Sequence, residues 1–333
     1  MLSDSTGNPS DPRVFDASRY ARPDLGIALK PSFRLGPDSR VFVLGNCFAN
    51  QVEMKLADAG VRADGGGLGP VYCIECAYQA AKWALRGGFD ERHIIRVDRG
   101  GSPLWFNPHR APETTHASLE EAVGAYRESL CRVGKGLREA DVLIVVLGVV
   151  EHFVDRQTKA AMNCLPQEFW SLRRSGRAES KRDRHADVVG GGLSLAFEVL
   201  AVNPGVRMIW GVSPITQDAT IVGSDVLVAN GYCKATLRSA VEEIVEQLRA
   251  RGVMADYFPF YELGTLNPRE KVFKEEFLGK AYGRMVRGRF VRDIVTPMLL
   301  DAYAPERRVA RTAAAEAQNA ERVPGGSLAG KDS

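Results

Sequence analysis

Cys47 occupies a turn between a strand and a helix, which is where a thiol can become a nucleophile. The stretch VFVLGNCFANQ, residues 41–51, starts as an apolar run, breaks at Gly45 and continues as a helix-like segment. Reactive groups of α/β proteins commonly lie at such turns. The thiolate is the attacking species, so the reaction needs a helix N-terminus or a nearby base that favours the charged form. Backbone N–H groups around Asn46 and Phe48 can bind an oxyanion. The alternative is an inert, buried cysteine in a crowded turn.

The five histidines are the candidates for a base that serves Cys47. His152 follows the end of the strand LGVVE, where Glu151 or Asp155 can orient its ring. His109, in LWFNPHRAP, lies on a loop that can cover a crevice. A solvated loop histidine is the alternative for both, and it is the preferred interpretation of the remaining three histidines, His93, His116 and His185.

Other polar residues occur near the ends of predicted strands. Glu262 can orient a base or bind a substrate hydroxyl, and the alternative is an ion pair with a local arginine such as Arg269. The same choice applies to Glu151. Ser213 and Thr216, in VSPIT, are candidate hydrogen-bonding neighbours of the site, although a Ser-Pro pair can also form a simple turn.

Two further motifs are interpreted as structural. Cys73 and Cys76 form one CxxC, but no second ligand pair lies near it in the sequence, so helix packing is preferred over a zinc or redox role. GGG occurs at 65–67 and at 190–192. Neither fits a phosphate-binding pattern, so both are interpreted as flexible loops, and no nucleotide, metal or other cofactor is expected.

These candidates need a scaffold that brings strand ends together. Strands are predicted at 40–45, 141–148, 207–215 and within 253–264. Helices are predicted at 47–60, 73–88, 119–140, 193–203, 226–252 and 282–299. Short continuous apolar runs are typical of strands buried on both faces, so the pattern indicates a doubly wound, mostly parallel α/β sheet flanked by helices. The polar turns at 44–47, 147–153 and 211–216 should then meet in one crevice.

Composition limits the class of protein. The chain has 333 residues, of which 45% are hydrophobic and 26% charged, and its net charge is +3. Nothing indicates nucleic-acid binding, and the longest apolar run is too short to span a membrane. The N-terminus does not resemble a secretory signal, so a cytoplasmic location is expected. We expect a disordered segment at 1–12, one domain at 13–303 with insertions near 88–118 and 153–190, and a frayed helix and tail at 304–333.

An ordered set of motifs resembles the GSCFA family, which belongs to the SGNH (GDSL-like) hydrolase fold group. The set covers roughly residues 30–295 and begins with RVFVLGNCFANQ, which has Asn46 where the family name has serine. The stretches that follow in order are GLGPVYCIECA, ADVLIVVLGVVEHFVD with MNCLP, RMIWGVSPITQDAT, ANGYCKATLRSAVEEI and DYFPFYELGTLNPR. The order makes the match specific for the family, whereas a substrate does not follow from a fold.

The resemblance implies a site. It places Cys47 at the nucleophile position and Asn46 at the position of an aspartate. Oxyanion and substrate contacts would come from the first turn, from glycines and an asparagine, and from the other motifs. These candidates are Gly45, Asn46, Phe48, Gly69, Gly148, His109, Asn163, Ser213, Thr216, Lys234, Tyr261 and Glu262. The late Asp-x-x-His of the fold group is absent, because Glu276 and Gly279 stand near its positions and no histidine follows His185.

Two functions remain open at this stage. The first is acyl-ester chemistry, either hydrolysis or acyl transfer, in which Cys47 attacks and His152 or His109 moves the proton. Its substrate would be a small molecule, a carbohydrate or a peptide derivative. An acyl-CoA or carrier-bound donor would suit a thiol nucleophile, with the basic segment 173–184 near its phosphates. The second is a degenerate family member that binds a ligand without catalysis.

Overall fold

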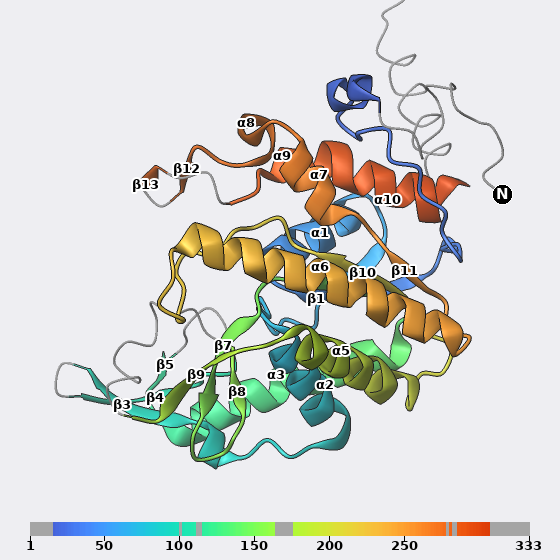
Figure 1. The fold of residues 1–333 in the computed structure, drawn as a ribbon. Helices are drawn as coiled ribbons and strands as arrows, with labels where there is room; N and C mark the ends of the chain where they lie inside the picture. The colour runs from blue at the N-terminus through green and yellow to red at the C-terminus, as the bar shows by residue number, and fades with distance from the viewer. Residues whose placement is uncertain are drawn as a thin grey trace, which may run out of the picture.

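The computed structural model describes residues 16–99, 102–110, 115–163, 176–277, 280–281 and 285–306. A five-stranded sheet forms its centre (Figure 1). The strands are β1 (Arg40–Gly45), β2 (Arg62–Asp64), β6 (Val142–Leu147), β10 (Arg207–Val212) and β11 (Ala255–Tyr257). Their order is β2-β1-β6-β10-β11, and every pair is parallel. This is a doubly wound order whose direction reverses between β1 and β6. The predicted fold class is confirmed.

Helices cover both faces of the sheet (Figure 1). One face carries α2 (Ile74–Arg86), α3 (Leu119–Glu139), α5 (His185–Leu200) and α6 (Val226–Ala250). The other carries α1 (Cys47–Asp58), α7 (Phe260–Leu266), α9 (Gly288–Phe290), a π-helical turn at Val291–Val295 and α10 (Thr296–Tyr303). The short helix α8 (Arg269–Val272) follows α7, and 3-10 turns lie at Ala17–Ala21 and Glu91–His93. The strands therefore need apolar side chains on both sides.

Alternation along each strand builds the two cores. In β6, Leu143 and Val145 belong to the core under α2, α3, α5 and α6, whereas Ile144 packs into the core under α1 and α10. All six residues of β6 are buried. Because successive side chains point to opposite faces, a strand between two helical layers becomes a continuous apolar run. This is the physical reason that the sequence pattern predicts these strands correctly.

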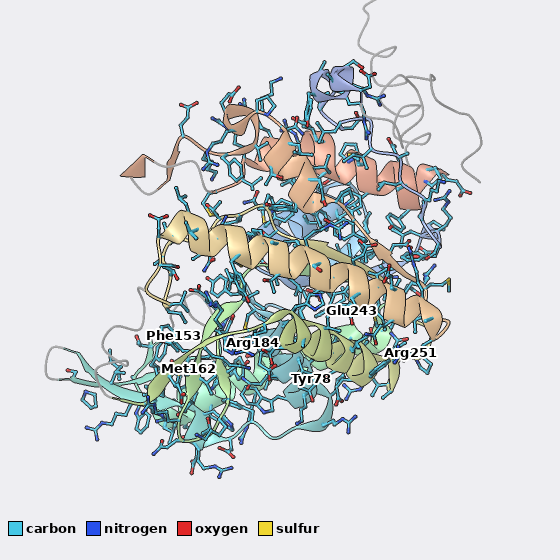
Figure 2. All side chains as sticks on the ribbon, viewed as in Figure 1. Tyr78, Phe153, Met162, Arg184, Glu243 and Arg251 are labelled. Carbon is cyan, nitrogen blue, oxygen red and sulfur yellow. The ribbon has the colours of Figure 1, made fainter. Side chains whose placement is uncertain are left out.

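The two segments expected as insertions or loops contain small antiparallel sheets. The first sheet consists of β3 (Ile95–Arg99), β4 (Ser102–Phe106) and β5 (Thr115–His116), and the second of β7 (Glu151–Asp155), β8 (Ala161–Met162) and β9 (Ala178–Arg182). Their shared core includes Phe153 and Met162, which pair across β7 and β8 and are labelled in Figure 2. Near the C-terminus, β12 (Glu276–Phe277) pairs with β13 (Lys280–Ala281).

Some predicted boundaries were wrong. Helix α5 begins at His185, so residues 190–192 are helical instead of a flexible loop, and Gly192 packs against Ile244 of α6. The last helical segment begins at Gly288 and not at 282. The expected disorder at 1–12 and most of the expected tail at 304–333 lie outside the described residues. Across the described part of the chain, no helix combines the length and the apolar character that crossing a membrane requires.

Candidate active site

The turn after β1 places Cys47 at the first residue of α1. Gly45 has φ +155°, and a Cβ at this position would lie 2.4 Å from the Val146 carbonyl oxygen, so only glycine fits. The Asn46 side chain caps the helix, because its Oδ1 accepts a hydrogen bond of 3.1 Å from the Phe48 N–H. Cys47 stays partly exposed while Asn46 and Phe48 are buried. The thiol therefore lies at the positive end of a helix dipole.

The end of β6 closes against this turn. A Cβ on Gly148 would lie 2.7 Å from Asn46 Nδ2 and 2.9 Å from the Tyr72 carbonyl oxygen. That carbonyl accepts the N–H groups of Gly148 and Val149. On one side of β6, the register pairs Gly45 with Val146. On the other side of β6, the Ser213 N–H donates to the Leu147 carbonyl. The predicted convergence of the three polar turns is therefore seen in the structure.

The side chain of Lys234, in α6, reaches Gly148, the residue that follows β6. Its side chain is 1% exposed, and its Nζ donates to the Gly148 carbonyl over 2.7 Å. Burial lowers the pKa of Lys234, and negative charge on Cys233 or Cys47 opposes this effect. A buried lysine with a lowered pKa can exchange a proton near neutral pH. The buried thiol of Cys233 lies 3.8 Å from the same carbonyl, and burial raises its pKa.

The structure places His152 beside another thiol, that of Cys73, and a role of His152 toward Cys47 stays a prediction. The ring is 3% exposed and lies 3.4 Å from Asp183, measured from Nδ1 to Oδ2. Burial opposes the charged form of His152, but the negative charges of Cys73 and Asp183 outweigh it and raise the pKa of His152 to about 9. His152 lies in β7, whose position was not visible in the sequence.

Glu151 and Asp155 do not orient His152. Side chains alternate along β7, so those of Glu151 and His152 point to opposite faces. Glu151 accepts hydrogen bonds from the Thr220 hydroxyl (3.0 Å) and the Ile221 N–H (2.9 Å). Asp155 forms an ion pair of 2.8 Å with an arginine of the 173–184 segment. Glu151 thus holds the loop that follows β10, which is a positioning role.

His109 belongs to a buried aromatic cluster. It is 3% exposed, its Nδ1 lies 2.8 Å from the Ala161 carbonyl oxygen, and its ring meets that of Trp83 edge to face with centroids 5.0 Å apart. Burial lowers its pKa to about 3. His93, expected to be solvated, is buried in the same cluster at 7% exposure. His109 is therefore a buried, neutral histidine and does not lie on an open loop, and its catalytic role stays a prediction.

Asn163 and Ser213 support the loops around the site. Asn163 accepts a hydrogen bond of 2.9 Å from the Tyr72 N–H and donates one of 2.8 Å to the Pro70 carbonyl. It therefore fixes the segment after Gly69, which has φ +83°. The Ser213 hydroxyl accepts a hydrogen bond of 3.2 Å from the Ile215 N–H. This contact forms the simple turn that the sequence analysis gave as the alternative.

Glu262 forms an ion pair, but with Arg238 of α6 at 2.8 Å and not with Arg269. Its other oxygen accepts a hydrogen bond of 2.5 Å from the Tyr257 hydroxyl. The neighbouring Tyr261 is half-buried, and burial together with Glu262 raises its pKa. Thr216 is half-buried in the loop after β10. Contacts of these residues with a substrate remain predictions.

The basic segment at 173–184 is largely engaged within the fold. Its first three residues lie outside the described part of the chain. Arg177 pairs with Asp155, Lys181 lies 3.1 Å from Asp183, and Arg182 covers the ring of Tyr232. These contacts give no support to a phosphate-binding role.

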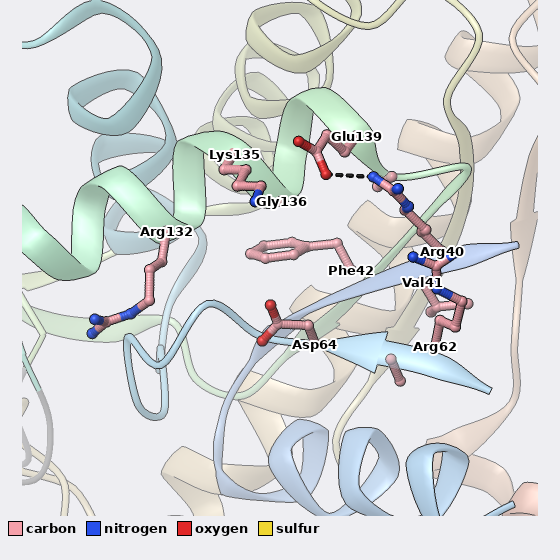
Figure 3. Close-up of a pocket in the computed structure, with 11 residues that line it drawn as sticks. Arg40, Val41, Phe42, Arg62, Asp64, Arg132, Lys135, Gly136 and Glu139 are labelled. Carbon is pink, nitrogen blue, oxygen red and sulfur yellow. Dashed lines mark hydrogen bonds and ion pairs between the residues drawn. The ribbon is translucent and has the colours of Figure 1, made fainter. Parts of the chain in front are cut away.

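Two pockets lie away from Cys47. The first, of about 530 Å³, is lined by Arg40, Phe42, Asp64 and Glu139 among others and adjoins the first residues of β1 (Figure 3). The second, of about 480 Å³, adjoins the small sheets near His93. Ligands of open parallel sheets bind beyond the carboxyl ends of the strands, so the topology favours the turn at Cys47 over either pocket as the site. The described residues contain no group of three or more His, Cys, Asp or Glu placed to hold a metal ion.

Comparison with known protein families identifies the family of this chain. The model of the GSCFA family matches residues 40–280, so the chain belongs to the GSCFA family. No curated protein matches the chain. Among solved structures, a family two carbohydrate esterase from Clostridium thermocellum, in complex with cellohexaose, is similar at a TM-score of 0.31 and 10% identity, over 83% of this chain and 66% of that one. An acetyl xylan esterase from Butyrivibrio proteoclasticus is similar at a TM-score of 0.31 and 10% identity, over 82% of this chain and 65% of that one. The chain thus spans just under two thirds of either structure.

The sequence analysis named Lys234 without giving it a chemical role. Lys234, Leu237 and Val241 are spaced three and four residues apart and are all buried in α6. Such spacing puts them on one helix face. A lysine on the apolar face of a helix is a signal that could have marked it as the partner of a site residue.

Proposed function

We propose that the protein catalyses acyl transfer from an ester, to water or to another acceptor, with Cys47 as nucleophile and Lys234 as its proton acceptor. The observation that carries this proposal is the buried amine of Lys234, held 2.7 Å from the carbonyl of Gly148, a residue that follows β6 and lies against the N-cap of α1. Membership of the GSCFA family and the placement of Cys47 at the switch point of the sheet support it.

In the first step, the Lys234 amine accepts the proton of the Cys47 thiol. The thiolate attacks the acyl carbonyl carbon and forms a tetrahedral oxyanion. Its negative charge is stabilised by the N-terminus of α1 and by the Asn46 amide, which lies against Gly148. The oxyanion collapses to a thioester on Cys47, and the Lys234 ammonium returns the proton to the leaving alcohol.

In the second step, water or an acceptor alcohol or amine attacks the thioester. Lys234 accepts a proton from the attacking group and returns it to the Cys47 sulfur as the acyl product leaves. A lysine suits this work because burial lowers its pKa and so favours the neutral amine that accepts a proton. The late histidine of the fold group is then unnecessary. The substrate class we propose is a small acylated molecule or carbohydrate.

The test is direct trapping of the thioester. The protein is incubated with p-nitrophenyl acetate, quenched in acid and digested with trypsin, and the peptide covering residues 41–55 is examined for an acetyl group. We expect acetylation of Cys47 and release of nitrophenol in the wild type. Cys47→Ala should lose both, and Cys131→Ala, which removes an exposed thiol, should change neither. Absence of acetylated Cys47 together with equal nitrophenol release by Cys47→Ala would contradict the proposal and favour a ligand-binding protein without catalysis.

A further inference from the structure

Four buried polar side chains form a cluster that the proposed acyl chemistry does not use. Cys73 and Cys76 are 2% and 4% exposed, and His152 and Asp183 are 3% and 1% exposed. They come from α2, from β7 and from the residue after β9. Burying four such groups together is costly unless they interact with one another.

The two thiols are arranged as a pair at a helix N-terminus. Cys73 is the N-cap of α2 and Cys76 is its third residue, and the two sulfur atoms lie 3.2 Å apart. A sulfur bonded to its partner lies about 2 Å away, so little movement separates this pair from a disulfide. The helix dipole favours negative charge on the first thiol, as in other CxxC motifs at helix N-termini.

His152 and Asp183 complete an arrangement that stabilises a thiolate. The His152 ring lies close enough to Cys73 for their charges to interact, and its Nδ1 lies 3.4 Å from Asp183 Oδ2. The charged groups around the cluster include Asp183 and Lys181, whose Nζ is 3.1 Å from Asp183 Oδ1, and the carboxylates of Glu75 and Asp187 also act on Lys181. Burial raises the pKa of Cys73, but the interactions with Cys76 and His152 lower it by more than burial raises it. The net shift of the pKa is therefore downwards.

We propose that Cys73 and Cys76 form a redox-active dithiol, which a small peroxide converts to a disulfide while His152 and Asp183 hold Cys73 as the thiolate. The near-complete burial of both sulfurs favours an oxidant of a few atoms over a protein disulfide. The second thiol distinguishes this site from a nucleophilic cysteine with a base, because it lies where it can resolve an oxidised Cys73.

The reaction balances with hydrogen peroxide as the oxidant. The Cys73 thiolate attacks one peroxide oxygen, the O–O bond breaks, and the leaving hydroxide takes a proton from His152 to form water. Cys73 is now a sulfenic acid. The Cys76 sulfur attacks the Cys73 sulfur, the S–O bond breaks, and the hydroxide leaves as a second water with the Cys76 proton. Two thiols and one peroxide give one disulfide and two waters, and a dithiol reductant reverses the oxidation.

The test measures oxidation of the full-length protein by hydrogen peroxide. Samples are quenched by alkylation under denaturing conditions, reduced, labelled with a second alkylating reagent and digested. Both cysteines fall in one tryptic peptide, residues 63–82, and the exposed Cys131 serves as an internal control. We expect Cys73 and Cys76 to take the second label together and well before Cys131 does. Incubation with dithiothreitol after the peroxide and before the first alkylation should abolish the second label.

Variants separate the roles of the groups. Cys76→Ser should stop at a sulfenic acid on Cys73, which dimedone traps. His152→Asn should slow oxidation at about pH 7 by roughly 30-fold, because an ordinary thiol of pKa about 8.5 is only about 3% ionised there, and the deficit should vanish above about pH 9. His93→Asn, which changes another buried histidine, should leave the rate unchanged.

Two results would overturn the proposal. One is Cys73 and Cys76 that both keep the first label at peroxide concentrations that oxidise Cys131. The other is an equimolar zinc ion bound by the two thiols in the purified protein. Since the readout is the label on residues 63–82, it is independent of Cys47 and of any esterase activity.

Discussion

Replacing Lys234 by methionine tests the pairing on which the proposed chemistry depends. The side chains are similar in length, and methionine fills the buried space without charge or hydrogen bond. Lys234 is 1% exposed, and its ammonium donates to the Gly148 carbonyl. The variant therefore removes the proton acceptor proposed for Cys47 and leaves the turn at Gly45 and Asn46 in place.

The expected effect on Cys47 follows from the ionisation of a thiol. An isolated cysteine with a pKa of about 8.5 is about 3% thiolate at about pH 7, whereas a thiol that has passed its proton to an amine is almost fully ionised. Lys234→Met should therefore lower the alkylation rate of Cys47 by up to about 30-fold. The lost hydrogen bond costs about 1–3 kcal/mol, which the smaller desolvation penalty of methionine offsets.

Stability should respond to pH with a definite sign. Burial lowers the pKa of Lys234 in the folded state, so the unfolded chain binds more protons between that pKa and the unfolded value of about 10.4. Folding stability of the wild type should therefore gain a contribution from Lys234 as the pH rises through this window. The methionine variant should lack that contribution.

The assay is iodoacetamide labelling of Cys47 against pH, read on the tryptic peptide 41–55, which becomes 41–62 in the control variant, with urea unfolding curves alongside. Lys55→Met is the matched control. Lys55 lies on α1, the helix that begins at Cys47, but it pairs with Asp58 and remains partly exposed. An unchanged rate for Cys47 in Lys234→Met, with the protein folded, would refute the pairing. A drop of the same size in Lys55→Met would show only a general effect of charge.

Three further predictions concern the scaffold. Gly45→Ala should lower the free energy of unfolding by roughly 2–4 kcal/mol, since its Cβ would lie 2.4 Å from the Val146 carbonyl oxygen. Gly124 in α3 has open space around it, so Gly124→Ala should raise the free energy of unfolding by up to about 1 kcal/mol in the same urea titration. Glu151→Ala should make the loop after β10 more mobile, which hydrogen exchange would show as faster exchange of its amides. Equal exchange rates in the wild type and the variant would contradict the positioning role of Glu151. The pKa of His109 is about 3 when folded and about 6.5 when unfolded, so it should cost stability at roughly 1.4 kcal/mol per pH unit as the pH falls through that window. His109→Phe should flatten this dependence in urea midpoints measured at several pH values, and an unaltered slope would argue against a neutral buried ring.

The family motif and the elements around it were predictable because their causes are local. An apolar run that ends at Gly45, followed by the helix cap Asn46, specifies a strand, a turn and a helix within a dozen residues. Burial between two helical layers makes the central strands uniformly apolar, and the sequence records this directly. The position of Cys47 at the start of α1 follows from the same short-range pattern.

The partners of each thiol were decided only by the tertiary structure. His152 faces Cys73 because β7 belongs to a small antiparallel sheet, and the alternation along that strand turns Glu151 the opposite way. Lys234 reaches the end of β6 because α6 packs across that face of the sheet. Such contacts join residues far apart in the chain, and they depend on crossing angles and strand register that no local pattern encodes. The sequence alone therefore determined which turn carries the proposed nucleophile, and the packing of the helices on the sheet determined which side chain we propose as its proton acceptor.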